Sequence, residues 1–384
     1  MIYYFHTSPR TRKLKNVRPD AKRYTEMKKD RIYLNLYKKI FAAVALAALL
    51  LSTLASCKPG DGASTSSPDT SAPLSPATSD SASVADTTGT PSTGTPSTGA
   101  SSGTESTTAP ALPSLSIPDG AIDAAQAIIY DVTSRRVLYS RNQVIDGKTY
   151  PASTTKLFTS WLALQYLSPD EVVTAGDELS LLASDASIAY IKRGHKLTAS
   201  MLVEAMMLPS GGDAAYVIAA AAGKKIYGSD SASAETAIKA FVNEMNRRLA
   251  ALGFSGTHFT NPDGYHDPDH YTTLEDMAGI AALALENSTI MKYTTLPSDR
   301  VIYASGQTNS WTNTNELIQP ESLYYCADAI GLKTGSTDEA GYCVMTATKG
   351  QDGRYYIIGV FGATTSFSRF TDAAVLIEYV LGKR

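Results

Sequence analysis

The hydrophobic and polar positions of this chain follow regular patterns only in its C-terminal two-thirds. Two short apolar runs, 126–132 and 136–140, flank a Thr-Ser-Arg turn and predict a β-hairpin. Apolar residues then recur every three or four positions and predict helices at 157–167, 198–208, 213–222, 237–252 and 273–285. The last part of the chain predicts strands at 330–336, 342–348 and 355–361 and a helix at 368–381. Strands at both ends with helices between them predict an α+β fold, an antiparallel sheet whose first and last segments meet, flanked by helices with a helical lobe.

The N-terminal part has a different pattern. Residues 1–39 are basic, and 40–54 form an almost unbroken apolar run that leads to Leu-Ala-Ser-Cys at Cys57. That run is short for a membrane span and suits the apolar segment of a signal peptide. Its ending resembles a bacterial lipobox, in which Cys57 would be lipidated and become the new N-terminus. A start at Met27 would give a more ordinary leader, with residues 1–26 a misannotated start.

Both interpretations of this apolar run place the rest of the chain outside the cytoplasm. A lipidated Cys57 predicts a lipoprotein anchored to the bacterial cell membrane, so a membrane is an expected partner. The alternative is a membrane-spanning anchor made by the same run.

Residues 58–116 are almost entirely Ser, Thr, Pro, Gly, Ala and Asp. Such a composition buries too little apolar surface to offset the loss of chain entropy on folding, so this segment is expected to be disordered. A flexible coil of this length spans about 40–45 Å on average. We therefore expect a tether that lets a catalytic domain at 117–384 reach polymer above the bilayer.

The net charge of −3 hides an asymmetry along the chain. Residues 1–57 hold 12 of the 34 basic residues and 3 of the 37 acidic residues. Without them, 22 basic and 34 acidic residues remain, which gives a net charge of −12. A mature protein this acidic is a poor candidate for binding nucleic acid.

The first candidate for chemistry is Ser153, which stands three residues before Lys156 at the start of a predicted helix. That spacing puts both side chains on one face of the helix, where they can touch. A serine hydroxyl becomes a good nucleophile when a base removes its proton, and a partly desolvated lysine can be that base. The free N–H groups of a helix N-terminus would also stabilise an oxyanion. On this fragment alone, a capping serine beside a solvated lysine is the competing interpretation.

Two later stretches favour the catalytic interpretation. Ser210-Gly211-Gly212 forms a turn between two predicted helices, and Lys333-Thr334-Gly335-Ser336 ends a predicted strand. The order Ser-x-x-Lys, Ser-Gly-x, Lys-Thr-Gly resembles the signature of penicillin-binding proteins and β-lactamases. From about residue 125 onward, the chain is similar to the low-molecular-weight D-alanyl-D-alanine carboxypeptidases, serine peptidase family S11. Other segments that carry this resemblance are 127–131, 137–140, 261–264, 270–273, 313–315 and 340–343.

The resemblance implies a β-lactamase/DD-peptidase-like fold and a serine-type D-Ala-D-Ala carboxypeptidase. Ser153 would attack the carbonyl carbon of the penultimate D-alanine in a peptidoglycan stem peptide and form an acyl-enzyme. Lys156 would take the proton of the serine, and Ser210 would relay a proton to the leaving D-alanine.

By the same resemblance, the third motif would bind the substrate. Lys333 and Thr334 would bind its terminal carboxylate, and Gly335 would let its backbone lie close to the strand. The backbone N–H groups of Ser153 and Ser336 would form the oxyanion hole. The resemblance also implies inhibition by β-lactam antibiotics and a reaction that needs neither a metal nor an organic cofactor.

One position departs from the family's second motif, which usually reads Ser-x-Asn. The third residue here is Gly212, and the missing asparagine normally helps to hold the substrate and the lysine. Asp213 is interpreted as a helix cap and not as a replacement. The departure leaves two alternatives, a DD-transpeptidase or endopeptidase and a non-catalytic penicillin- or peptidoglycan-binding protein. A β-lactamase is disfavoured because the sequence has no Glu-x-x-Leu-Asn segment between the second and third motifs.

Two further groups have structural interpretations that we favour. His266 and His270, with two aspartates between them, look like a metal cluster. They lie in a loop rich in Pro, Gly and Asp that resembles the family's loop, which we favour over a zinc site. Export would permit a disulfide between Cys326 and Cys343, but a buried free thiol is common on a strand such as the one that holds Cys343.

Overall fold

Residues 114–144 and 148–384 are described by the computed structural model of this chain, and they fall in one compact unit. The predicted leader with Cys57, and the predicted tether apart from residues 114–116, lie outside the described residues. Within the described ranges, no helix is both long and apolar enough to cross a membrane.

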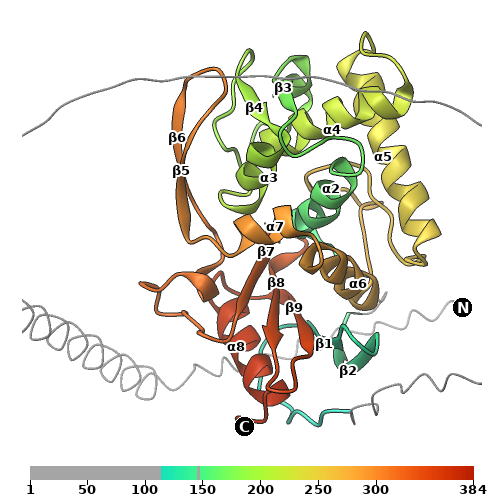
Figure 1. Ribbon diagram of the computed structural model, residues 1–384. Helices are drawn as coiled ribbons and strands as arrows, with labels where there is room; N and C mark the ends of the chain where they lie inside the picture. The colour runs from blue at the N-terminus through green and yellow to red at the C-terminus, as the bar shows by residue number, and fades with distance from the viewer. Residues whose placement is uncertain (1–113, 145–147) are drawn as a thin grey trace, which may run out of the picture. The chain divides into compact units, whose positions relative to one another are not determined.

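A five-stranded antiparallel sheet, with strand order β2-β1-β9-β8-β7, forms one layer of the fold (Figure 1). Its strands are β1 (Gln126–Asp131), β2 (Arg136–Asn142), β7 (Ile330–Thr337), β8 (Gly341–Lys349) and β9 (Tyr355–Ala363). β1 pairs with β2 through the predicted hairpin and with β9 on its other side, so Ile129 lies opposite both Tyr139 and Ile358. The first and last strands of the sequence pattern therefore meet, as predicted, and β7 is an edge strand.

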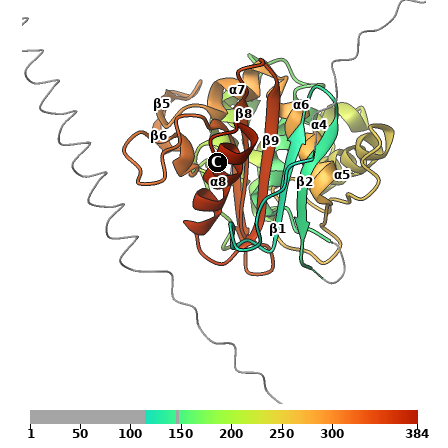
Figure 2. The ribbon, with the colours of Figure 1, turned by 90° about the horizontal axis from the view of Figure 1, so that it is seen from below.

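Each face of the sheet is buried in a core of its own, because side chains alternate along a strand. On β9, Ile357 and Phe361 belong to the core shared with the helical lobe. Ile358 and Val360 belong to the core beneath α8 (Ser368–Val380). Figure 2 shows α8 in front of the sheet, with other helices behind it. Burial on both faces explains why these strands read as nearly continuous apolar runs.

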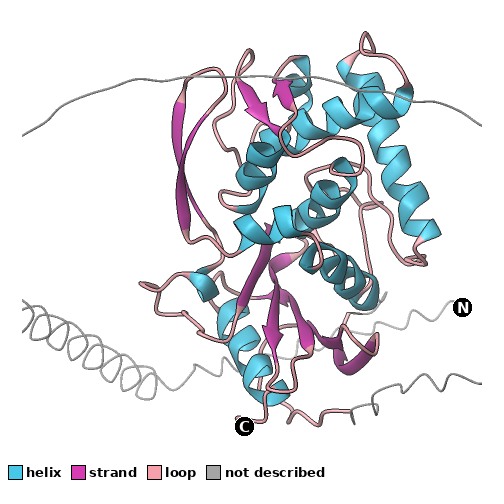
Figure 3. Ribbon diagram, viewed as in Figure 1, coloured by secondary structure: helices cyan, strands magenta, loops and turns pink. Residues whose placement is uncertain are grey.

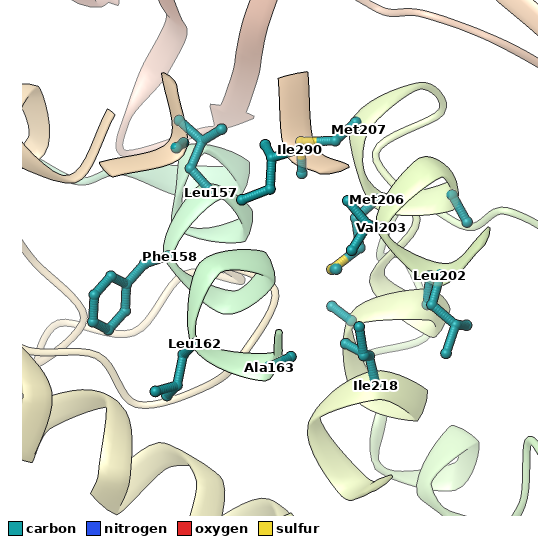
Figure 4. Close-up of a cluster of buried hydrophobic side chains, with 14 of the residues drawn as sticks. Leu157, Phe158, Leu162, Ala163, Leu202, Val203, Met206, Met207, Ile218 and Ile290 are labelled. Atoms are coloured by element: carbon teal, nitrogen blue, oxygen red, sulfur yellow. The ribbon is translucent and has the colours of Figure 1, made fainter. Parts of the chain in front are cut away.

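The helical lobe lies on the side of the sheet away from α8 (Figure 3). Its helices are α2 (Lys156–Ala163), α3 (Ala199–Met207), α4 (Gly212–Tyr227), α5 (Ala234–Ala251), α6 (Leu274–Leu285) and α7 (Ser288–Thr294). In the lobe core, Ala163 of α2 lies across from Ile218 of α4, and Ile290 of α7 lies between α2 and Val203 and Met206 of α3 (Figure 4). This packing fixes the start of α2, the position that the sequence identified as catalytic.

Capping residues set most helix boundaries close to the predicted ones. Thr198 accepts the N–H of Met201 at 3.1 Å and starts α3. Ser233 caps α5, which therefore begins three residues before the predicted 237. α4 runs past the predicted end at 222 to Tyr227 and stops at Gly228, whose φ is +84°.

Several short elements were missed by the sequence prediction. They are the antiparallel pair β3 (Val172–Thr174) with β4 (Lys196–Thr198), the hairpin β5 (Ser298–Ile302) with β6 (Thr308–Thr312), helix α7, and the 3₁₀ turns η1 (Ala152–Thr155), η2 (Asp177–Leu181) and η3 (Glu316–Ile318). Three-residue strands are too short to show an alternation. In the hairpin of β5 and β6 only Val301 and Trp311 are buried, so its pattern is largely polar.

Candidate active site

The sequence predicts Ser153 in the first turn of an α-helix. In the structure it lies in the 3₁₀ turn η1, directly before α2. Residues three positions apart eclipse each other in a 3₁₀ turn. Lys156 Nζ therefore donates a hydrogen bond of 2.8 Å to Ser153 Oγ. Ala152, directly before the serine, has a φ of +46°, a strained value for a residue with a Cβ. The structure thus brings the predicted nucleophile and base together on a tightly held turn.

Lys156 is only 1% exposed, so its charged form loses most of its hydration. Burial lowers the pKa of Lys156 to about 8, and the negative charges of Asp263 and Asp213 oppose that fall. Nζ also donates to the carbonyl oxygen of Asp263 at 2.6 Å. A lysine with a pKa this close to neutrality is partly present as the free amine, the form that can accept a proton from a serine.

The loop at 260–270 encloses the lysine from the other side. The N–H of Thr260 donates to His270 Nδ1 at 3.1 Å, which leaves the ring hydrogen on Nε2 to donate to Thr155 Oγ1 at 2.9 Å. Burial lowers the pKa of His270 to about 3 and keeps the ring neutral. His270 therefore ties this loop to the turn that carries Ser153.

In the described part of the chain, no group of three or more His, Cys, Asp or Glu side chains could hold a metal ion.

Ser210 lies on the cleft, in the turn between α3 and α4, with a φ of +64°. Ser187 Oγ donates to its carbonyl oxygen at 2.6 Å and fixes the turn. The prediction that Asp213 caps α4 is wrong, because the helix starts one residue earlier and Gly211 is its N-cap. The carboxylate of Asp213 instead accepts the N–H groups of residues 189 and 191, each at 2.8 Å, and anchors the loop beside the cleft.

Lys333, the expected partner of the substrate carboxylate, is a buried residue of β7. Its side chain is fully buried, Nζ donates to the carbonyl oxygen of Thr334 at 3.0 Å, and the residue does not line the cleft. Burial lowers the pKa of Lys333 well below its ordinary value, and the positive charges of Lys156 and Arg369 act in the same direction. The structure therefore holds this lysine in a buried position on β7, near enough to Lys156 for the two charges to interact.

The rest of the third motif follows the free edge of β7. Thr334 and Ser336 line the cleft, and Thr334 Oγ1 lies 2.5 Å from Thr314 Oγ1. A Cβ on Gly335 would lie 3.0 Å from the backbone nitrogen of Ser153, tighter than ordinary contacts. The absence of a side chain at Gly335 thus lets β7 lie close to η1. The segment that packs against Gly335 in this structure is the turn that carries Ser153.

Arg369, at the start of α8, is a cleft residue that the sequence prediction missed. Its Nη1 donates to the carbonyl oxygens of Gly335 at 3.1 Å and Cys343 at 3.4 Å. It is half-buried, and burial lowers the pKa of its guanidinium without removing the charge. The signal available in the sequence was an arginine at the start of the last predicted helix, which indicates nothing until α8 is placed against β7.

These elements enclose a cleft of about 540 Å³ between the lobe and the edge of the sheet. Its volume suits a short peptide or a small ligand. The site residues expected from the sequence that line it are Ser153, Ser210, Thr334, Gly335 and Ser336. The other lining residues are Asp185, Ala186, Ser187, Pro209, Asp263, Gly264, Tyr265, His266, Thr314, Thr337, Asp338, Glu339 and Arg369.

Both cysteines in the described residues are free thiols. Cys343 is buried on β8, its Sγ lies 3.5 Å from the carbonyl oxygen of Ala340, and burial raises its pKa to about 12. Burial also raises the pKa of Cys326. Neither thiol is activated as a nucleophile, because the thiolate is the reactive form.

Comparison with known sequences supports the same class of protein. A family model described as D-alanyl-D-alanine carboxypeptidase matches residues 110–365. A D-alanyl-D-alanine carboxypeptidase of Streptomyces sp. (strain K15) is 33% identical over 282 residues, which cover 71% of this chain and 92% of that protein. The carboxypeptidases DacF of Bacillus subtilis and DacA of Escherichia coli K12 are 28% and 29% identical over 68% and 67% of this chain. The matches span 63% and 60% of the length of those two relatives.

Solved structures confirm the predicted DD-peptidase-like α+β fold. The crystal structure of the Streptomyces K15 DD-transpeptidase matches with a TM-score of 0.60 at 29% identity, and the match covers 69% of this chain and 100% of that one. A D-alanyl-D-alanine carboxypeptidase structure from Mycobacterium tuberculosis matches with a TM-score of 0.58 at 27% identity over 70% and 94% of the two chains. The chain belongs to the D-alanyl-D-alanine carboxypeptidase family, serine peptidase family S11.

Proposed function

We propose that this carboxypeptidase removes the terminal D-alanine of peptidoglycan stem peptides through an acyl-enzyme on Ser153. The observation that carries the proposal is the buried contact of 2.8 Å between Lys156 Nζ and Ser153 Oγ. A non-catalytic binding protein would have no need for a lysine whose pKa burial lowers to about 8 beside a cleft-lining serine.

In the proposed first half-reaction, neutral Lys156 accepts the Ser153 proton while Oγ bonds to the carbonyl carbon of the penultimate D-alanine. The electron pair of the C=O bond moves to oxygen, where the N–H groups of Ser153 and Ser336 stabilise it. When the intermediate collapses, the C–N bond breaks and the D-alanine nitrogen gains a proton through Ser210. Water then adds to the acyl-enzyme and releases the shortened peptide, which regenerates Ser153.

For the terminal carboxylate we propose a different partner from the one first expected. Arg369 and Thr334 line the cleft, whereas Lys333 does not. The guanidinium of Arg369 would pair with the carboxylate, and Thr334 would add a hydroxyl donor. The substrate backbone would extend along the free edge of β7, where residues 334–337 line the cleft. Lys333 is fully buried on the same strand, and the positive charge of Lys156 lowers its pKa.

A DD-transpeptidase is the second candidate, since one of the matching structures is that of a DD-transpeptidase. The same acyl-enzyme would then react with an amine instead of water. The two reactions are separated by adding a glycyl acceptor peptide and measuring both the hydrolysed and the transferred product. A carboxypeptidase is expected to give mainly hydrolysed product at millimolar acceptor.

The proposal is tested with the purified full chain, a fluorescent penicillin and a diacyl-Lys-D-Ala-D-Ala peptide. We expect covalent labelling and D-alanine release, both lost in Ser153→Ala. Ser180→Ala is the matched control, because it removes an exposed hydroxyl in η2 that is outside the cleft. Labelling of the Ser153→Ala variant at the wild-type rate would contradict the proposal.

The chain is also proposed to act at the outer surface of a bacterial membrane, held by a lipid on Cys57. The Leu-Ala-Ser-Cys sequence after an apolar run and the low-complexity segment 58–116 support this proposal. In a bacterial host, Cys57→Ser is expected to abolish the incorporation of radioactive palmitate. If the variant still incorporates palmitate, the lipid is not on Cys57.

A further inference from the structure

The space beside Gly212 is filled from another part of the chain. A Cβ built on Gly212 would lie 2.9 Å from Asp263 Oδ2, 2.9 Å from Leu182 Cδ1 and 3.1 Å from the carbonyl oxygen of Ser187. Contacts below 3.0 Å require something to move. Position 212 is the one that departs from the second motif, and the structure leaves no room for an asparagine there while Asp263 keeps its place.

Asp263 also touches the catalytic lysine. It is 4% exposed and lines the cleft, and its own carbonyl oxygen accepts the Nζ hydrogen of Lys156 at 2.6 Å. Its Oδ1 accepts the N–H of Tyr265 at 3.3 Å, which leaves Oδ2 on the side of Gly212. One residue therefore contacts Lys156 through its backbone and fills the missing part of the second motif through its side chain.

We infer that Asp263 and Gly212 form a matched pair, in which the Asp263 side chain replaces the absent motif side chain while the carbonyl oxygen and the charge of Asp263 hold Lys156. The inference rests on the proposed function, since Lys156 is the base of that reaction. Asp263 is a positioning residue here, because it acts through the lysine.

Four charged or titratable groups interact with Lys156. Asp263 and Asp213 are carboxylates that favour its ammonium form. The positive charge of Lys156 lowers the pKa of Lys333, and His270 is neutral. The Asp213 carboxylate accepts two N–H groups of the 189–191 loop, so its removal would disturb the fold. Asp263 is thus the charge whose effect on Lys156 can be tested in isolation.

The first test is the pH dependence of acylation in Asp263→Asn, which keeps the shape and removes the charge. Loss of a nearby negative charge lowers the pKa of a lysine, so the acid limb of the rate profile is expected to move down by roughly one pH unit. Asp269→Asn is the control, because it removes an exposed carboxylate of the same loop that is absent from the cleft lining. An unmoved acid limb in Asp263→Asn would overturn the inference.

The second test exchanges the two positions. Gly212→Asn alone is expected to lower penicillin acylation at least tenfold, because its Cβ meets the Asp263 carboxylate and the end of the Leu182 side chain, each at 2.9 Å. Gly212→Asn combined with Asp263→Ala should recover acylation by roughly tenfold over Gly212→Asn, a coupling of the size seen for residues in contact. If Gly212→Asn lowers acylation by the same factor in the wild type and in the Asp263→Ala variant, the two positions are independent.

Thermal unfolding of the wild type, the two single variants and the double variant gives a readout that does not depend on catalysis. The melting temperature is expected to fall in Gly212→Asn and to rise again in the double variant. If the wild-type protein is not acylated at all, the proposed function fails while this cycle still measures the Gly212–Asp263 coupling. If the wild type is acylated normally but the melting temperatures show no coupling, the matched pair is refuted and the proposed function is not.

Discussion

At the scale of single residues, the site is organised around one buried lysine. Lys156 has two hydrogen-bond partners, Ser153 Oγ and the carbonyl oxygen of Asp263, and almost no contact with solvent. Burial costs its charged form more than the two nearby carboxylates return, so its pKa falls to about 8. The neutral fraction at pH 7 is therefore roughly a tenth, compared with less than about a thousandth for an ordinary lysine.

This pKa predicts the pH dependence of acylation. Below about pH 8 the base is mostly protonated, so the acylation rate constant should rise about tenfold per pH unit and level off above pH 8. The measurement is the rate of labelling by a fluorescent penicillin between pH 5.5 and 9.5. A rate that is flat across this range, or that rises only near pH 10, would contradict Lys156 as the base.

Lys156→Arg separates charge from basicity. An arginine keeps the positive charge but cannot lose its proton, so acylation should fall by roughly 10² to 10⁴-fold at every pH. Circular dichroism checks that the variant is folded. Activity within tenfold of the wild type would show that a fixed cation is sufficient at this position.

At the scale of elements, the site depends on two segments that pack against the turn η1. These segments are β7 and the loop at 260–270. Gly335 allows β7 to lie against the turn, and Gly264 does the same for the loop. A Cβ on Gly264 would lie 1.9 Å from the carbonyl oxygen of Ala152, with φ at +81°. The two glycines therefore set the distances between the segments.

Gly264→Ala is expected to push the loop away from η1 and to remove the Lys156 contact with Asp263. We expect loss of acylation and a fall in the free energy of unfolding of at least about 3 kcal/mol, the sum of steric displacement and a strained φ. Gly306→Ala is the matched control, because Gly306 has a φ of +89° but no atom within 4 Å of its Cβ position. It should cost only about 1–2 kcal/mol and leave acylation intact. Equal effects of the two substitutions in denaturant unfolding would contradict this role for the close contact.

The sequence could predict the local part of the site and not the assembled part. Ser153 and Lys156 are three residues apart, so any helical turn brings them together. The cleft position of Arg369 and the burial of Lys333 depend on how α8 and the lobe pack against β7, which periodicity does not encode. Asp263 and Gly212 lie in separate segments, so their contact was equally hidden. The main helices and the sheet were predictable because their apolar periods are long, whereas the short strands show too few residues.

At the scale of the whole molecule, the last helix closes the fold onto its beginning. Asp372 of α8 accepts the N–H groups of Asp123 and Ala124 through Oδ2, at 3.1 and 2.8 Å. Burial nevertheless raises the pKa of Asp372 to about 6, against the effect of these two hydrogen bonds. A carboxyl group with a raised pKa contributes stability at low pH that is lost as the pH rises through about 6.

Asp372→Asn should therefore raise the melting temperature at pH 8 by a few degrees and have a smaller effect near pH 4. The asparagine keeps one oxygen to accept both N–H groups and has no charge to bury. Thermal unfolding at pH 4, 6 and 8 measures the difference, with Asp230→Asn as an exposed control. A lower melting temperature at pH 8 would show that the charged form is the favoured partner of the two N–H groups.

Ser153 as the nucleophile and Lys156 as its base are the two roles on which the proposed reaction depends. They are tested together by intact-protein mass spectrometry after incubation with benzylpenicillin, followed by peptide mapping of the adduct. We predict one added penicillin per chain, located on Ser153 and absent from both Ser153→Ala and Lys156→Arg on the same time scale. An adduct on Ser210 or another residue, or a wild-type protein that forms none, would contradict these roles.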